Sequence, residues 1–210
     1  MRYGFVVLAA GFTGLLSFSL LAVAIGTDYW YIIDVNKPNY TGSEDLSSHS
    51  GLWRINEGKN RSSVIHSFTA NLSSLSETER NLLGLHRVVV IMLPFSLVLL
   101  VFGWIFGLVS SLARSPNLLS GSGCYFLFCS LFTLCGISIY IRYSQQAMEE
   151  FQRIVPPENL TYVDVSFGWS FAIAWLSYSL EVATGLLLML AARVTQLKGH
   201  YDSGVAFAMV

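Results

Sequence analysis

The chain has 210 residues, of which 53% are hydrophobic and 12% are charged, with a formal net charge of −1. Because a soluble domain carries about 25% charged residues, this composition excludes an ordinary soluble domain. The balanced net charge gives no indication of nucleic-acid binding. Four apolar stretches reach the roughly 20 residues that a membrane-spanning helix needs: Phe5–Gly26, Val88–Val109, Leu118–Ile141 and Phe167–Ala192. The sequence therefore predicts one polytopic membrane domain, residues 1–210, built as an all-α four-helix bundle.

The first apolar stretch has two interpretations. Ala22-Val23-Ala24 is similar to the small-residue cleavage site of a secretory signal. However, the apolar run Phe5–Gly26 is longer than the core of about 7–15 residues that such a signal has. We expect an uncleaved first span, and both interpretations place the following segment outside the cytosol.

The distribution of charge predicts the orientation of the spans. With a cytosolic N-terminus, residues 27–87 and 142–166 form two outer loops and residues 193–210 form a cytosolic tail. The cytosolic side then carries one acid, Asp202, against four bases, Arg2, Arg114, Arg193 and Lys198. Lys and Arg concentrate on the cytosolic side of membrane spans. We therefore expect a multi-pass protein of the plasma membrane with both termini in the cytosol.

Four N-x-S/T sequons lie in the loops assigned to the outside. They begin at Asn39, Asn60 and Asn71 in the first loop and at Asn159 in the second. N-glycosylation acts on that side of the membrane, so the sequons agree with the charge criterion. A glycoprotein is predicted, in which Asn159, close to a membrane end, is the least favourable acceptor.

The first outer loop is long enough to carry structure of its own. The alternating residues Asp28–Val35 predict a strand, Gly51–Ile55 a second strand and Val64–Asn71 a weaker third. Ser74–Leu85 predicts a short helix with a capping box that begins at Ser76. A small antiparallel β-sheet with a short helix is therefore expected here.

The second outer loop is predicted to begin as a polar extension of the third span. Pro156-Pro157 should break this helix, and Tyr162–Ser166 alternates like a strand that joins the sheet of the first loop. Trp169 then lies at the start of the fourth span, a normal position for an aromatic anchor at the membrane interface.

Glu181 lies near the middle of the fourth span. An ionised acid there costs roughly 2.5–3.5 kcal/mol, which the apolar residues of the segment offset. Glu181 is either an intramembrane proton or ion site, or a protonated and hydrogen-bonded packing residue. Because no second acidic or basic residue lies deep in another span, the sequence favours packing.

The chain lacks the motifs of catalysis. No glycine-rich phosphate loop, HExxH or G-x-S-x-G motif is present, and the four histidines are scattered along the sequence. No catalytic residue, cofactor or metal site is therefore predicted, and an enzyme is not expected. All three cysteines, Cys124, Cys129 and Cys135, lie in the third span, so no disulfide is predicted in the outer loops.

One pattern in the first loop resembles a family signature. Trp30 followed by Gly51-Leu52-Trp53 is similar to the W…GLW signature of the claudin, peripheral myelin protein and calcium-channel gamma-subunit superfamily. Gly26–Tyr31, Leu46–Arg54 and Val165–Ser170 look like the branch that contains transmembrane protein 235 and transmembrane protein 114. The resemblance covers nearly the whole chain. It implies a four-helix membrane bundle with a small extracellular antiparallel β-sheet.

The resemblance also implies a role in protein–protein contact. Members of the superfamily associate with one another at cell junctions or bind other membrane proteins laterally. We therefore expect self-association or lateral binding in the membrane or at cell contacts. The alternative is an auxiliary regulatory subunit of an ion channel or an AMPA-type glutamate receptor. The apolar carboxyl end, Phe207–Val210, is of the kind that docks in a PDZ-domain groove by strand addition.

One departure from the family pattern concerns a cysteine pair. The resemblance implies a disulfide after the GLW motif that pins the strands of the first loop. In this chain Asn56 occupies the first cysteine position, and Ser62 or a neighbour occupies the second. Losing such a bond typically costs about 2–5 kcal/mol in small extracytoplasmic domains. Packing and the bilayer are expected to hold the sheet instead, or the outer domain is looser than that of its relatives.

Overall fold

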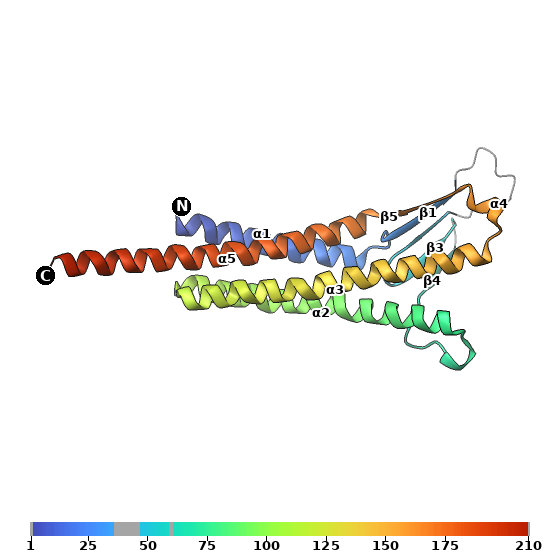
Figure 1. The fold of residues 1–210 in the computed structure, drawn as a ribbon, viewed down its shortest axis with the longest axis horizontal. Helices are drawn as coiled ribbons and strands as arrows, with labels where there is room; N and C mark the ends of the chain where they lie inside the picture. The colour runs from blue at the N-terminus through green and yellow to red at the C-terminus, as the bar shows by residue number, and fades with distance from the viewer. Residues whose placement is uncertain (1, 36–46, 59–60, 210) are drawn as a thin grey trace. The chain divides into compact units, whose positions relative to one another are not determined.

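The computed structural model describes residues 2–35, 47–58 and 61–209. Its long helices are α1 (Tyr3–Gly26), α2 (Glu77–Ala113), α3 (Pro116–Ile154) and α5 (Trp169–Ala208) (Figure 1). Each of these four helices is long and apolar enough to cross a membrane. The prediction of four spanning helices is therefore confirmed. The helices continue well beyond the predicted spans, because the polar ends of α3 and α5 remain helical.

A five-stranded antiparallel sheet accompanies the helices. Its strands are β1 (Tyr31–Val35), β2 (Ser48–Ser50), β3 (Arg54–Glu57), β4 (Arg61–Val64) and β5 (Val163–Phe167). They lie in the order β4-β3-β2-β1-β5. The strand of the second loop thus joins the sheet of the first loop, as predicted, and its partner there is β1. Two short helices lie outside the sheet, η1 (Leu72–Ser74) and α4 (Pro157–Leu160).

The chain divides into two compact units. Unit 1 comprises Met1–Leu20, Phe95–Thr133 and Leu176–Val210, and unit 2 comprises Leu21–Pro94 and Leu134–Trp175. All five strands belong to unit 2, whereas the described part of unit 1 consists of helix segments and the turn between α2 and α3.

Hydroxyl side chains link the helices of unit 1. Ser17 Oγ donates to the carbonyl oxygen of Ser177 at 2.9 Å, and the hydroxyls of Thr13 and Thr184 lie 2.8 Å apart. Membrane helices associate through close packing and hydrogen bonds, because lipid is as apolar as the side chains themselves. These small polar pairs therefore hold α1 against α5.

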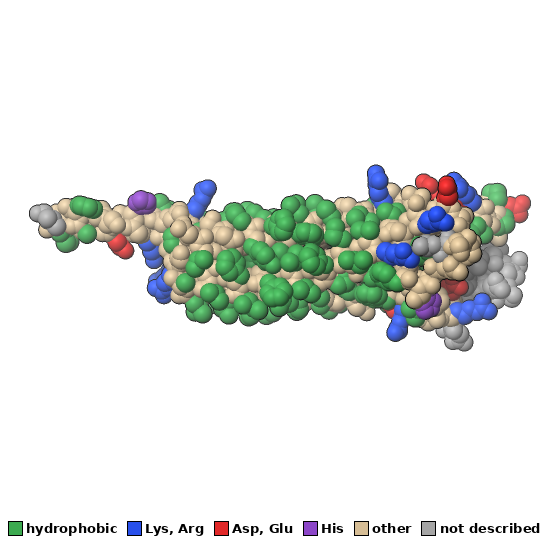
Figure 2. All heavy atoms as spheres, turned by 90° about the horizontal axis from the view of Figure 1, so that it is seen from below, with side chains coloured by type: hydrophobic (Ala, Val, Ile, Leu, Met, Phe, Trp, Pro, Cys, Tyr) green, Lys and Arg blue, Asp and Glu red, His purple; other side chains and the backbone are tan. Residues whose placement is uncertain are grey.

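The outward surface of the helices is strongly apolar. Large hydrophobic side chains such as Leu8, Phe12, Phe102 and Leu112 are exposed. Figure 2 shows hydrophobic side chains spread over the helices on one face. An apolar surface of this extent matches the hydrocarbon of a bilayer better than water. Together with the four long helices, it identifies a multi-pass integral membrane protein.

Two predictions for the first outer loop are wrong in detail. Gly51-Leu52-Trp53 is not part of a strand but forms the turn between β2 and β3, closed by the Gly51 N–H donating to the Arg54 carbonyl at 2.9 Å. Burial of Leu52 overrides the β-propensity of this turn. The predicted third strand, Val64–Asn71, is also misplaced, because β4 ends at Val64.

The helix predicted over Ser74–Leu85 is the first part of α2, which begins at Glu77 and runs on without interruption. Its capping box is confirmed. The Ser76 N–H donates to Glu79 Oε2 at 2.9 Å, and the Glu79 N–H donates to Ser76 Oγ at 3.4 Å. These reciprocal bonds satisfy donors that would otherwise lack a partner at the start of a helix.

The two positions of the family cysteine pair face each other in the sheet. Asn56 of β3 is the direct register partner of Ser62 of β4, and it also pairs with His49 of β2. The Asn56 side-chain nitrogen lies 3.2 Å from His49 Nε2. A hydrogen bond to the neighbouring strand therefore stands where the resemblance implies a covalent bond.

Replacing both positions by cysteine, Asn56→Cys with Ser62→Cys, should create a disulfide. Directly opposed residues in antiparallel strands have Cα atoms about 4.5–5.5 Å apart, which a disulfide spans without strain. Oxidation should stabilise unit 2 by about 2 kcal/mol, given the short loop that the bond closes. The melting temperature of the purified protein, oxidised and then reduced, measures this effect, with Ser62→Cys alone as the control. Failure to form the bond would contradict the register of β3 and β4.

Candidate functional site

The two tryptophans of the signature hold the carboxyl end of α1. The last carbonyl groups of a helix have no partner within the helix itself. Trp30 Nε1 donates to the Ala24 carbonyl at 2.7 Å, and Trp53 Nε1 donates to the Ile25 carbonyl at 2.9 Å. Residues 23 positions apart in the sequence thus cap adjacent carbonyls of one helix end.

The two anchors differ in burial. Trp30 is fully buried, with its ring centroid 4.8 Å from that of Tyr140 and 6.1 Å from that of Phe171, both in edge-on geometry. Trp53 keeps 40% of its surface exposed. Edge-on aromatic pairs add about 0.5–1.5 kcal/mol beyond the area that they bury. Trp30 therefore carries most of the packing energy, whereas Trp53 contributes mainly its hydrogen bond.

Two glycines allow the backbone to pass close to the segment after α1. A Cβ atom on Gly51 would lie 2.6 Å from the Cα of Asp28, and one on Gly168 would lie 1.9 Å from the carbonyl oxygen of Tyr29. Neither distance is tolerable for a side chain. The Gly168 N–H uses this proximity to donate to the Trp30 carbonyl at 2.9 Å. Gly51, the glycine of the signature, is thus required because any side chain there would clash with the backbone of Asp28.

His86 fixes the turn from the side of α2. Its Nε2 lies 2.8 Å from the carbonyl oxygen of Leu52, which can only accept, so the proton is on Nε2. Its Nδ1 then accepts from the Ser67 hydroxyl. Sequence alone gave no reason to single out His86, because its contact with the signature spans 34 residues. The only local signal is a lone histidine just before the second apolar stretch.

A stack of aromatic rings lies where α1, β2 and α5 meet in unit 2. The rings of Tyr29 and His49 are parallel within 1° at 4.5 Å, and Trp169 continues the stack 5.7 Å from Tyr29. Tyr29 and Trp169 remain 40% and 46% exposed. We call these three residues the aromatic stack. Large exposed aromatic rings held rigidly by one another are suited to contact with lipid or a protein partner.

An open groove of about 580 Å³ borders the edge strand β5. One wall is Tyr31 and Phe167, packed edge-on at 5.8 Å, and the other carries Gln145, Glu149 and Gln152 of α3. Burial raises the pKa of the Tyr31 phenol, which therefore stays neutral at physiological pH. The groove thus combines amide, carboxylate and phenol groups beside an edge strand that has unpaired backbone groups.

Glu181 is fully buried in unit 1. Thr133 Oγ1 of α3 lies 2.9 Å from Glu181 Oε1 and 3.1 Å from Oε2 and donates to this carboxyl group, and the Ser96 hydroxyl of α2 bonds to Thr133. One polar network therefore ties α2, α3 and α5 together. Across the described ranges, no group of three histidine, cysteine, aspartate or glutamate side chains gathers as a metal site would require.

The sequons are distributed unevenly over the described structure. Asn71 is exposed directly before η1, and Asn159 is half-buried within α4. Asn39 and Asn60 lie outside the described residues. Of the two acceptors that can be compared, Asn71 is the more accessible.

Known proteins resemble this chain over most of its length. The family described as "PMP-22/EMP/MP20/Claudin tight junction" matches residues 15–190. The voltage-dependent calcium channel gamma-5 subunit of Mus musculus is 31% identical over 180 residues, covering 80% of this chain and 63% of that protein. The gamma-3 subunit of Homo sapiens is 30% identical over 184 residues, covering 81% of this chain and 56% of that protein. The chain thus spans less than two thirds of the length of these relatives.

Replacement of Trp30 should damage the protein more than replacement of Trp53. Trp30→Ala removes a fully buried ring and should cost about 3–5 kcal/mol, whereas Trp53→Ala should cost about 1–2 kcal/mol. Trp30→Phe keeps an aromatic ring but loses the N–H, so its stability relative to wild type reports mainly on the hydrogen bond to the Ala24 carbonyl. Thermal stability and delivery to the cell surface measure the effect, with the exposed Trp169→Ala as the control. Equal stability of Trp30→Ala and Trp169→Ala would contradict the anchoring role.

Proposed function

Since the chain belongs to the PMP-22/EMP/MP20/claudin family, we propose that it acts without catalysis, by lateral protein–protein contact in the membrane, as an auxiliary subunit of an ion channel. The observation that carries this proposal is the similarity to two calcium-channel gamma subunits, which covers 80% and 81% of this chain. The shared part therefore includes most of the helices and the sheet. Membership of the branch with transmembrane proteins 114 and 235 stays a prediction.

The aromatic stack supports a lateral contact. Interface hot spots are enriched in tryptophan and tyrosine, because a rigid ring buries a large area at little entropic cost. Tyr29 and Trp169 are exposed and already held in place by stacking, so a partner helix that covers them does not have to order them. The groove beside β5 adds polar groups that can form hydrogen bonds with a partner and so fix its orientation.

A second candidate function is self-association between cells. The matching family description names the tight junction, and the exposed edge strands β4 and β5 offer unpaired backbone groups to another sheet. In that case copies of this chain would contact one another through unit 2. Self-complexes at cell contacts, with no channel present, are the expected result for this function.

For the orientation, we propose a plasma-membrane glycoprotein with both termini in the cytosol. The bases Arg2, Arg114, Arg193 and Lys198 support this orientation, as does the exposure of Asn71 in unit 2. Docking of the carboxyl end in a PDZ domain also stays a proposal. Because α5 remains helical to Ala208, its last residues would have to unwind before they add as a strand.

Co-purification from native membranes should recover a voltage-dependent channel with the wild-type chain. The double variant Tyr29→Ala with Trp169→Ala should reduce recovery about tenfold or more, because truncation of hot-spot residues commonly costs 2 kcal/mol or more. Tyr162→Ala is a matched control, since Tyr162 is similarly exposed but lies outside the stack. Quantitative mass spectrometry of the captured proteins measures the change. Recovery of self-complexes alone would favour the junctional function and refute the auxiliary one.

Glycan attachment tests the orientation. Enzymatic deglycosylation should lower the apparent mass of the surface-delivered protein, and Asn71→Gln should remove one glycan. Asn159→Gln should change the glycan load less, because Asn159 is half-buried in α4. An antibody tag at the carboxyl end should be detected only after permeabilisation. Detection of that tag on intact cells would overturn the orientation.

A further inference from the structure

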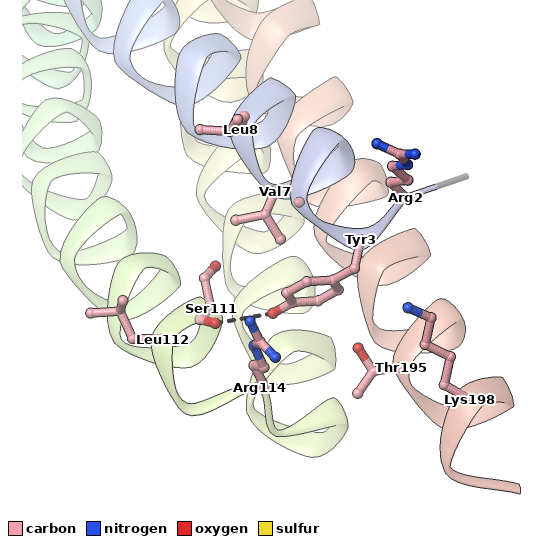
Figure 3. Close-up of a pocket in the computed structure, with 10 residues that line it drawn as sticks. Arg2, Tyr3, Val7, Leu8, Ser111, Leu112, Arg114, Thr195 and Lys198 are labelled. Carbon is pink, nitrogen blue, oxygen red and sulfur yellow. Dashed lines mark hydrogen bonds between the residues drawn. The ribbon is translucent and has the colours of Figure 1, made fainter. Parts of the chain in front are cut away.

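A basic cavity of about 610 Å³ lies in unit 1, where α1 begins and α2 turns into α3. Three bases from three separate elements line it: Arg2 before α1, Arg114 in the α2–α3 turn and Lys198 on α5. Figure 3 shows Arg114 beside Tyr3 and the Lys198 side chain reaching toward the same ring. No carboxylate of the described chain lines the cavity, so it is suited to an anion.

Tyr3 positions the arginine of the turn. Its hydroxyl donates to the Ser111 carbonyl at 3.0 Å, and the guanidinium carbon of Arg114 lies 6.0 Å from the centre of its ring. A cation–π contact of this kind restrains the guanidinium group without using its N–H donors. Those donors remain available to an anionic group in the cavity.

The backbone of Arg114 gives independent support. Within the described residues, Arg114 is the one non-glycine residue with a positive φ, 49°. Helices commonly end with a glycine in this left-handed conformation, because a side chain is disfavoured there. The chain places an arginine where glycine fits best, and strain of this kind concentrates at binding sites.

An apolar groove of about 150 Å³ continues from the cavity between α1, α2 and α5. It shares Val7, Leu8 and Ser111 with the cavity, and its length is opened by the small residues Gly11 and Gly107. The groove runs along helices that are long and apolar enough to span a bilayer. A basic cavity joined to an apolar groove at the end of membrane helices is complementary to a phospholipid, because the cavity suits an anionic headgroup and the groove suits an acyl chain.

From this juxtaposition we propose that unit 1 binds an anionic phospholipid, with its phosphate groups in the basic cavity and part of one acyl chain in the groove. Arginine forks bind phosphate oxygens in pairs, and basic pockets between membrane helices accommodate phosphorylated headgroups. The cavity alone would accept a soluble phosphate as well. The groove favours the lipid, because only the lipid has a chain to fill it. This inference does not depend on the proposed auxiliary function.

Binding to the purified full chain in detergent tests the proposal. The probes are a short-chain phosphatidylinositol bisphosphate, a phosphatidylcholine of equal chain length, and soluble inositol trisphosphate. We expect the anionic lipid to bind about tenfold more tightly than either of the other two, because it alone combines a net negative headgroup charge with methylene groups that the groove can bury.

Four variants separate the two parts of the site. Arg114→Gly and Lys198→Gln should each weaken binding of the anionic lipid about fivefold, whereas Arg193→Gln, on α5 but outside the cavity, should leave it unchanged. Arg114→Gly relieves the backbone strain, so it should retain or raise thermal stability, and its loss of binding is not a loss of fold. Gly11→Leu fills open space; it should weaken the lipid but not inositol trisphosphate.

The result that overturns the proposal is also specific. Equal binding of the two lipids, or an Arg114→Gly with Lys198→Gln double variant that binds like wild type, would refute the phosphate site. Inositol trisphosphate that binds as tightly as the lipid, together with no effect of Gly11→Leu, would refute the lipid as the occupant.

Discussion

The end of α1 is the constraint on which unit 2 depends. Thr27 Oγ1, Trp30 Nε1 and Trp53 Nε1 donate in turn to the carbonyls of residues 23, 24 and 25. One strand starts directly after Trp30, and another starts directly after Trp53. The same bonds that satisfy a helix end therefore fix where two strands of the sheet begin. Without these three donors, the last carbonyl groups of α1 would lack hydrogen-bond partners.

The turn Gly51-Leu52-Trp53 is held from two sides. The Trp53 indole donates to the end of α1, and the Leu52 carbonyl accepts from His86 of α2. A neutral imidazole with one donor and one acceptor fits this position, because it joins a carbonyl to a hydroxyl at a buried site. Trp30, Trp53 and His86 therefore form one connected anchor. This anchor does not include the disulfide that the resemblance implies for relatives.

The membrane architecture could be predicted from sequence because hydrocarbon thickness imposes a minimum length on every span. Resemblance to the family identifies the signature residues, and alternation predicts a strand in the second loop that joins the sheet, whereas its pairing with β1 is seen only in the structure. At Gly51-Leu52-Trp53 the sequence predicts a strand and the structure has a turn, because aromatic and aliphatic residues that are typical of strands serve here as anchors. The role of His86 could not be predicted, because its contact with Leu52 spans 34 residues. The left-handed backbone of Arg114 could not be predicted either, because an arginine does not indicate that conformation.

The sheet has a consequence for biosynthesis. All cysteines of the chain belong to α3, so the strands contain no thiol to oxidise. The sheet can therefore assemble as soon as its strands meet, without waiting for the slow steps of disulfide formation and reshuffling. It also has no bond for a reductant to break. The sheet of this protein is thus indifferent to the redox state of its surroundings, unlike a sheet that relies on a disulfide for its stability.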